Sequence, residues 1–257
     1  MLGLVPDMIY RNLATVIENA HLEIVGKAFS AYASGLACLV DDEKEIGATV
    51  VDIGGGMTSI ASFRHGFPVY FSSIPVGGNN VTNDIAFGLT TSFAHAERLK
   101  TLHGCAFLTR KDSEETINVY PVGEEDDSSI KQITKAELIS IITPRIEEIF
   151  ELVNQKLEEQ GLKDISSHRV VLTGGGSQLS GIREVATMVL DKQVRIGRPK
   201  NISNLPEILY NPAYSTCIGL LLFALNYTER KPNKIVNKPA GNSGALGKIL
   251  GWIKQNF

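Results

Sequence analysis

Two glycine runs in this sequence have the residue types and the setting of loops that bind phosphate. Each follows a short apolar segment and is followed closely by a hydroxyl side chain. A phosphate group needs a close approach of the backbone and several N–H donors, which glycine permits because it has no Cβ. The runs lie about 120 residues apart, and two are harder to explain as ordinary tight turns than one. The candidate binding residues are Gly54, Gly55, Gly56 and Thr58 in the first run, and Gly174, Gly175, Gly176 and Ser177 in the second.

Asp52 stands just before the first run, where a carboxylate could assist a cation that accompanies a phosphate. Mg²⁺ keeps several of its waters and is usually held through one or two carboxylates, so Asp52 is a candidate for an indirect Mg²⁺ contact. We find no convincing catalytic base besides Asp52. Neither run matches the Walker pattern GxxxxGK[ST] or the dinucleotide pattern GxGxxG, which disfavours P-loop and Rossmann interpretations.

Strands and helices alternate around these runs, which predicts an α/β fold. A hairpin turn over Arg64–Gly66 makes two of the strands antiparallel, so the sheet should be mixed. The charged run Asp41–Glu45 is interpreted as a solvated loop. Strands are predicted at Ala48–Asp52, Thr58–Phe63, Phe67–Ile74, Val170–Leu172 and near Val194. Helices are predicted at Asp7–Ala20, Ala31–Leu39, Thr134–Gln160, Gly181–Leu190 and around Leu220.

The composition excludes several other classes of site. The net charge of −3 offers no global attraction for nucleic acid. Three scattered cysteines form neither a disulfide framework nor a CxxC metal site. No histidine pair has the HExxH spacing, and no apolar run reaches the roughly 20 residues of a membrane span.

The segments around both glycine runs resemble the superfamily of actin, Hsp70 and the sugar kinases. Asp52–Gly56 is similar to its second phosphate loop, and Val171–Gly181 is similar to its adenosine motif. Two further segments, Ile74–Ala86 and Ala94–Lys100, resemble the FtsA family of bacterial cell-division proteins in particular. The resemblance implies an actin-like (ribonuclease H-like) mixed sheet flanked by helices, with an inserted smaller α+β subdomain.

This resemblance also implies ATP and Mg²⁺ as cofactors, with Glu97 and Lys100 contacting the ribose or adenine. The alternative for these two side chains is a solvated helix face. The first phosphate loop of the superfamily has no counterpart here, so we expect an amino-terminally truncated chain that binds ATP weakly and is at most a weak ATPase. Three further positions depart from the family pattern, namely Ser30, Met57 and Ser59.

The resemblance divides the chain into five parts. They are a remnant of the first actin-like subdomain (1–47), a core subdomain (48–88 plus 165–227), an inserted subdomain (89–164), a flexible linker (228–243) and a terminal helix (244–257). The linker is rich in Pro, Gly and Asn and has no sustained periodicity.

The last segment is predicted to be an amphipathic helix that lies in a membrane surface. Its large apolar residues fall within an arc of about 100° on a helical wheel. About 14 residues span only about 21 Å, too short to cross a bilayer. Trp252 flanks the arc, and Lys248 and Lys254 can meet anionic lipid. The membrane-contacting residues would be Leu246, Ile249, Leu250, Trp252, Ile253 and Phe257. The alternative is a helix docked on the protein core.

The resemblance implies an adaptor that tethers the FtsZ ring to the cytoplasmic face of the bacterial inner membrane at the division site. The FtsZ C-terminal tail would dock on residues 89–164, with self-association, other divisome proteins and the lipid surface as further contacts. Candidate contacts for the tail are Arg98, Lys100, Arg110 and Lys111. The alternatives are a soluble small-molecule kinase or phosphatase of the same superfamily and, third, an Hsp70-like chaperone.

Overall fold

A computed structural model describes residues 7–108, 114–123, 130–162, 169–200, 202 and 204–230, with side chains described as far as residue 226. The chain divides into two compact units, Met1–Leu225 and Asn226–Phe257. Within the described residues, no helix is both long and apolar enough to cross a membrane.

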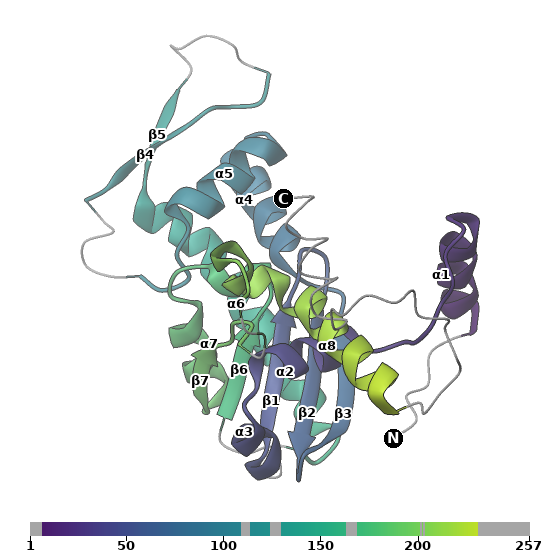
Figure 1. The fold of residues 1–257 in the computed structure, drawn as a ribbon. Coiled ribbons are helices and arrows are strands. Elements are labelled where there is room, and N and C mark those ends of the chain that lie inside the picture. Colours follow the sequence, from purple (N-terminus) through teal and green to yellow (C-terminus); the bar gives the residue numbers. More distant parts are fainter. Residues whose placement is uncertain are drawn as a thin grey trace. The chain divides into compact units, whose positions relative to one another are not determined.

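A five-stranded mixed sheet forms the centre of the first unit (Figure 1). Its strands lie in the order β3-β2-β1-β6-β7, where β1 pairs antiparallel with β2 and parallel with β6. The predicted mixed sheet is therefore confirmed. The strands are β1 (Ala48–Ile53), β2 (Thr58–Arg64), β3 (Phe67–Ile74), β6 (Arg169–Thr173) and β7 (Gln193–Ile196).

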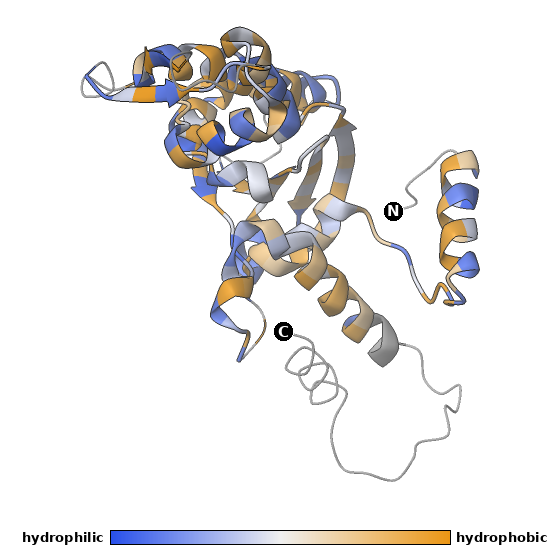
Figure 2. Cartoon of the chain, turned by 90° about the horizontal axis from the view of Figure 1, so that it is seen from above, coloured by the Kyte–Doolittle hydropathy of each residue, from blue (hydrophilic) through white to orange (hydrophobic). Residues whose placement is uncertain are grey.

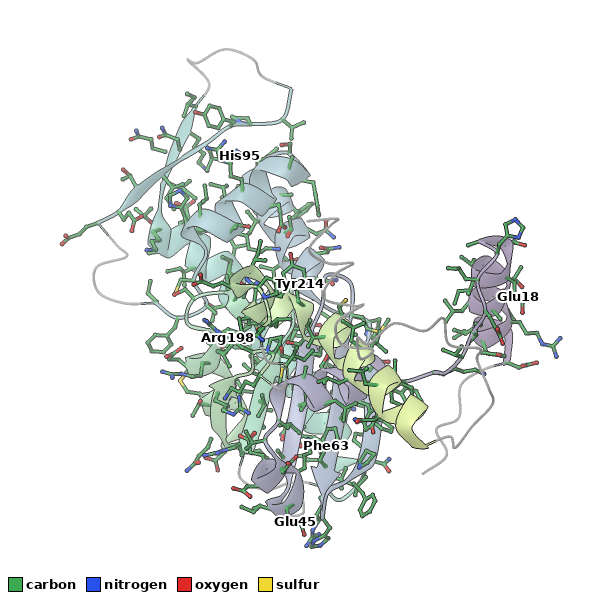
Figure 3. All side chains as sticks on the ribbon, in the orientation of Figure 1. Glu18, Glu45, Phe63, His95, Arg198 and Tyr214 are labelled. Atoms are coloured by element: carbon green, nitrogen blue, oxygen red, sulfur yellow. The ribbon has the colours of Figure 1, made fainter. Side chains whose placement is uncertain are left out.

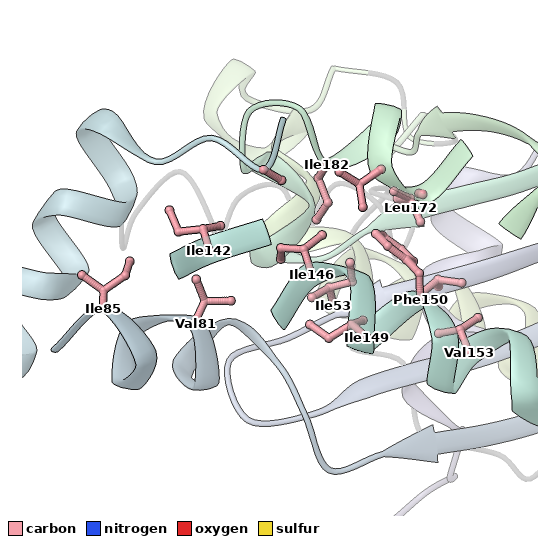
Figure 4. Packing of buried hydrophobic residues seen from close by; sticks show 14 of the residues in the cluster. Ile53, Val81, Ile85, Ile142, Ile146, Ile149, Phe150, Val153, Leu172 and Ile182 are labelled. Atoms are coloured by element: carbon pink, nitrogen blue, oxygen red, sulfur yellow. The ribbon is translucent and has the colours of Figure 1, made fainter. Parts of the chain in front are cut away.

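Alternate residues of β1 point to two separate hydrophobic clusters, as the pleat of a strand requires. Val51 and Ile53 belong to a cluster with α4 (Gly78–Leu89), α5 (Phe93–His103), α6 (Lys135–Glu158) and α7 (Ile182–Leu190) (Figure 4). Ala48 and Val50 belong to a second cluster, with α2 (Ser30–Cys38) and α8 (Ser215–Arg230). Helices thus cover both faces of the sheet. Asp52 shares the parity of Val50 and lies on the α2 and α8 side.

The remaining elements are short or lie outside the main sheet. Strands β4 (Thr116–Val119) and β5 (Lys131–Thr134) pair as a separate two-stranded sheet. The 3₁₀ turns in the described part of the chain are η3 (Gly175–Gln178), η4 (Glu207–Tyr210) and η5 (Pro212–Tyr214). Helix α1 (Asp7–Asn19) has no buried residue, and Figure 2 shows hydrophobic and hydrophilic residues alternating along it.

The interpretation of Asp41–Glu45 as a solvated loop is wrong, because the structure has a helix there, α3 (Asp41–Ile46). Acidic side chains in the first turn are stabilised by the positive end of the helix dipole. One of these side chains, Glu43, is buried against two arginines. From the sequence we expected all of these charged side chains to face solvent. In the structure Glu43 is buried, because it forms an ion pair with arginines that are distant in the sequence.

Candidate functional site

The two glycine turns lie side by side at one edge of the sheet. β1 and β6 are adjacent and parallel, and Asp52 is paired with Thr173 in their register. Each glycine turn begins one or two residues after these partners, so both turns leave the sheet at its carboxyl-terminal edge. In open α/β sheets this edge is where ligands bind.

Gly174 makes the contact between the two turns. Its φ of 83° and ψ of 166° fall in a region that is essentially restricted to glycine. A Cβ at this position would lie 2.3 Å from Oδ1 of Asp52 and 2.5 Å from the carbonyl oxygen of Ile53. The absence of a side chain therefore lets the second turn pack directly on the end of β1.

Free backbone donors are present in both turns. Among the described residues, no acceptor lies on the N–H groups of Gly55 and Gly56 in the first turn, or of Gly175 and Gly176 at the start of η3. Gly55 and Gly56 are also exposed. Successive unpaired N–H groups in a turn favour an anion. The geometry thus presents donors from both turns at one edge of the sheet.

The amino-terminal end of α4 is seated on the first turn. The amide of Gly78 donates to the carbonyl of Gly54 over 2.9 Å, and that of Asn79 donates to the carbonyl of Gly55 over 2.7 Å. A Cβ on Gly77 would lie 2.6 Å from both carbonyl oxygens. This close backbone contact fixes the carbonyls of the turn and leaves its amides open.

Two of the predicted binding side chains instead bond to backbone carbonyls. The hydroxyl of Thr58 donates to the carbonyl of Val76 over 2.8 Å, and that of Ser177 donates to the carbonyl of Gly174 over 2.7 Å. Both side chains are buried. In this structure they hold the turns in shape, and the exposed donors of the site are backbone amides.

Asp52 is held by two hydroxyl groups that the sequence analysis did not single out. Oδ2 of Asp52 accepts from Ser34 Oγ over 2.5 Å and from Thr216 Oγ1 over 2.7 Å. Ser34 belongs to α2 and Thr216 to α8, far from Asp52 in the chain. The only local sign of this contact in the sequence is Ser34 itself, a polar residue among the small, buried residues of α2.

Glu97 and Lys100 lie together on α5 and reach the first turn through α4. Lys100 Nζ donates to Glu97 Oε2 over 2.7 Å and to the carbonyl of Gly78 over 3.1 Å. Thr82 Oγ1 donates to the same carboxylate oxygen over 2.5 Å. Burial raises the pKa of Glu97, but hydrogen bonds from Lys100 and Thr82 outweigh it, so the pKa lies below its usual value. Lys100 is only 16% exposed, which excludes the solvated helix face for its amine.

A hollow of about 360 Å³ adjoins the second turn. Its wall includes Ser177 and Gln178 of the turn, the start of α7, and Ile196 and Arg198 at the end of β7. Figure 3 labels Arg198 at this side of the sheet and Glu45 at the opposite end. The hollow has room for a group larger than phosphate, and it meets the second turn at Ser177 and Gln178.

The remaining predicted residues fall into two groups. Arg98 is exposed on α5, whereas Arg110, Lys111 and the six membrane-contacting residues from Leu246 to Phe257 lie outside the described residues. Ser30 and Ser59, two positions that depart from the family pattern, lie together with their hydroxyl oxygens 3.1 Å apart.

No cluster of three or more His, Cys, Asp or Glu side chains in the described residues could hold a metal directly. Asp52 nevertheless fits a hydrated Mg²⁺, because no donor among those residues lies on its second oxygen, Oδ1. A single carboxylate is enough for an ion that keeps most of its waters.

Comparison with solved structures identifies the fold. The structure resembles MreB5 of Spiroplasma citri bound to ADP, with a TM-score of 0.71 and 20% identity, covering 88% of this chain and 69% of that one. It also resembles a chain of the PilM–PilN type IV pilus biogenesis complex, with a TM-score of 0.60 and 20% identity over 84% of this chain and 57% of that one. These similarities confirm the predicted actin-like fold.

Sequence comparison identifies the family. The cell division protein FtsA of Agrobacterium fabrum is 40% identical and that of Escherichia coli K12 is 34% identical, each over 96% of this chain. The chain spans only 56% and 60% of the length of these two relatives. The profile of the family described as Cell division protein FtsA matches residues 49–219, about two thirds of the chain. The chain therefore belongs to the FtsA family of cell division proteins.

Proposed function

We propose that this chain is the nucleotide-binding part of a cell-division adaptor and that it holds Mg-ATP on its two glycine turns. The observation that carries the proposal is the contact between the turns, which presents free amides from both at one sheet edge. Structural relatives solved with ADP and with AMPPNP support a nucleotide as the ligand.

Each part of the site would have a separate role. The amides of Gly55 and Gly56 would donate to phosphate oxygens, and those of Gly175 and Gly176 would donate from the second turn. Mg²⁺, when bound with the nucleotide, would neutralise phosphate charge, and Asp52 would accept hydrogen bonds from its waters. Glu97 and Lys100 would contact the ribose or adenine, as the family resemblance implies.

Gly56→Val tests this assignment with little risk to the fold. No atom lies within 4 Å of a Cβ at Gly56, so a side chain there would occupy only the space of the ligand. We expect unchanged thermal unfolding and loss of the heat of Mg-ATP binding in a calorimetric titration. Wild-type heat in the variant, or no heat with the unaltered chain, would contradict the nucleotide proposal.

We further propose that the FtsZ tail docks on the inserted subdomain, residues 89–164, where α5 begins, and on the adjoining end of α4. Backbone hydrogen bonds tie this junction to the segment after β4, since Val122 N donates to the carbonyl of Thr90 over 3.0 Å. Large apolar side chains are exposed on both segments, and they are Phe87, Phe93, Tyr120 and Val122. The exposed guanidinium of Arg98 lies on α5 as well. Lys100 is already engaged within the protein and is a weaker candidate.

Fluorescence anisotropy with a labelled FtsZ C-terminal peptide tests this surface. Phe87→Ser should weaken peptide binding, because Phe87 is 91% exposed and can contribute only to a partner. Phe67→Ser is a matched control, since Phe67 is also exposed, at 72%, and is the first residue of β3, outside the proposed docking surface. Equal effects of the two substitutions would refute the docking site.

The sequence-predicted terminal helix, residues 244–257, would tether the chain to lipid. Ile253 lies on the apolar arc. Ile253→Glu should release the chain from anionic liposomes, because burying a charge in the apolar part of the membrane is costly. Gln255→Glu is the control, since residue 255 lies opposite that arc on a helical wheel. Co-sedimentation that is the same for both variants would argue against tethering.

These proposals together place the chain at the cytoplasmic face of the inner membrane at the division site, where it would self-associate and meet other divisome proteins. The division into a core (48–88 plus 165–227) and an inserted subdomain (89–164) belongs to the same proposal. Membership of a cell-division family favours this function over the soluble kinase or phosphatase alternative.

A further inference from the structure

The oxygen atoms of Asp52, Ser34 and Thr216 form a closed triangle. The two hydroxyls lie 2.5 and 2.7 Å from Oδ2 of Asp52 and 2.8 Å from each other. Each hydroxyl carries one proton, so two hydrogen bonds at most serve the three contacts. With both protons donated to Oδ2, this oxygen is satisfied and the rotation of the carboxylate is restricted.

The other carboxylate oxygen, Oδ1, is left for a ligand. It lies beside Gly174, where the second glycine turn begins, at 2.3 Å from the position that a Cβ would take. Among the described residues, no lysine or arginine forms an ion pair with Asp52. Asp52 is only 8% exposed, so a cation that coordinates Oδ1 or donates to it through a bound water would be its first cationic partner among these residues.

We infer that Ser34 and Thr216 are positioning residues that hold Asp52 so that Oδ1 faces the hydrated Mg²⁺ of the bound nucleotide. The inference rests on the proposed nucleotide function and specifies which residues make the site responsive to Mg²⁺. Groups that orient a metal-binding side chain typically change metal affinity by 10- to 100-fold when they are removed. A merely structural cluster would instead alter the stability of the fold or nucleotide affinity regardless of Mg²⁺.

A second pair of buried hydroxyl side chains, in the central sheet, supplies matched controls. Thr49 Oγ1 and Ser62 Oγ lie 2.9 Å apart on β1 and β2, and both residues are buried. This pair has the same chemistry as Thr216 and Ser34, but its hydroxyls bond to each other and not to Asp52. Substitutions at the two pairs therefore remove the same atoms, in one case from hydroxyls that donate to Asp52 and in the other from hydroxyls that bond to each other.

The experiment measures the affinity of a fluorescent ATP analogue with excess Mg²⁺ and with EDTA, and takes the ratio of the two. The variants are Ser34→Ala, Thr216→Val and Thr216→Ser, with Ser62→Ala and Thr49→Val as controls. We expect the Mg²⁺ enhancement to fall roughly tenfold in Ser34→Ala and Thr216→Val while the affinity in EDTA stays near wild type. Thr216→Ser retains the hydroxyl and should restore the enhancement, and both controls should match wild type.

Four results would overturn the inference. An unchanged enhancement in Thr216→Val, or an equal loss of affinity with and without Mg²⁺, would show that the triangle is structural only. A wild-type chain that binds the analogue without any Mg²⁺ enhancement would refute the positioning role but leave nucleotide binding intact. A wild-type chain that binds no analogue under either condition would refute the proposed function and the inference together. Should Ser34→Ala not fold, the two substitutions at the less buried Thr216 decide the matter.

Discussion

Two buried carboxylates at opposite ends of the central sheet are held in different ways. Glu43, before β1, is 7% exposed and receives Arg195 Nε and Nη2 over 2.7 and 2.5 Å. Asp52, near the end of β1, is 8% exposed and receives only hydroxyl groups. A carboxylate that is neutralised within the fold has a structural role, whereas one without a cation is suited to a ligand. This difference distinguishes Glu43, which belongs to a stabilising ion pair, from Asp52, which belongs to a candidate ligand-binding site.

The pKa of Glu43 reflects its complete neutralisation. Burial raises this pKa, but hydrogen bonds from Arg195 and the Val40 amide, together with the charges of Arg195 and Arg169, lower it further than burial raises it. The pKa in the folded protein therefore lies below the usual value. The ion pair links α3 to β6 and β7, three elements that are distant in the sequence.

The largest expected effect concerns the glycine that lies against Asp52. Gly174→Ala should destabilise the fold by about 3–5 kcal/mol. The backbone conformation at this position is essentially restricted to glycine, and the added Cβ would overlap with atoms of Asp52 and Ile53. Gly56→Ala, in the other turn, meets no atom and should change stability by less than about 0.5 kcal/mol. Urea denaturation measures both. A tolerated alanine at residue 174 would mean that the turns do not touch.

Loss of the Glu43 carboxylate should have the next largest effect. Glu43→Ala leaves Arg195, which is 25% exposed, without its partner, and should reduce the free energy of unfolding by about 2–3 kcal/mol. Glu45→Ala, on the same helix, removes an exposed carboxylate and should have an effect of less than about 0.5 kcal/mol. If chemical denaturation gave similar losses of unfolding free energy for Glu43→Ala and Glu45→Ala, the buried ion pair would be no more stabilising than the surface one.

Acid should weaken the Glu43 pair in a defined direction. Because the folded pKa of Glu43 lies below its ordinary value of 4.5, the pair stabilises the fold fully above that pH and is lost as the pH falls through the lower folded pKa. The stability difference between wild type and Glu43→Gln should therefore shrink below about pH 4.5. A constant difference across this range would indicate that the carboxylate is not ion-paired.

A smaller effect on stability than that of Glu43→Ala is expected at the other buried carboxylate. Asp52→Asn keeps the shape of the side chain and an acceptor for the two hydroxyls, so the free energy of unfolding should change by about 1 kcal/mol or less. We expect a larger change in the Mg²⁺ dependence of nucleotide binding, because the charge is lost. A stability loss as great as that of Glu43→Ala would assign Asp52 a structural role instead.

Much of this fold was predictable because the sheet strands are short, buried and punctuated by glycine. Thr134 begins α6 as a capping residue should, with its hydroxyl accepting from the amide of Glu137 over 3.2 Å. Ser92 does the same for α5. These local signals need no knowledge of distant residues, and the boundaries of the helices follow from them.

The part that was missed depends on residues brought together only by folding. α3 was interpreted as a loop because its burial of Glu43 requires Arg195, which lies 152 residues later. Ser34 and Thr216 could not be assigned to Asp52 for the same reason, since Thr216 lies 164 residues beyond it. Spacing along the chain predicted which turns could bind phosphate but not which side chains hold them.

The central claim is that the two glycine turns form one anion-binding site, and amide NMR of the labelled chain tests it most directly. Titration with Mg-ATP to millimolar concentrations detects weak as well as tight binding. We predict that the amide signals of Gly55, Gly56, Gly175 and Gly176 shift together along a single binding curve. Shifts confined to one turn, or absent from both while other regions respond, would contradict the account.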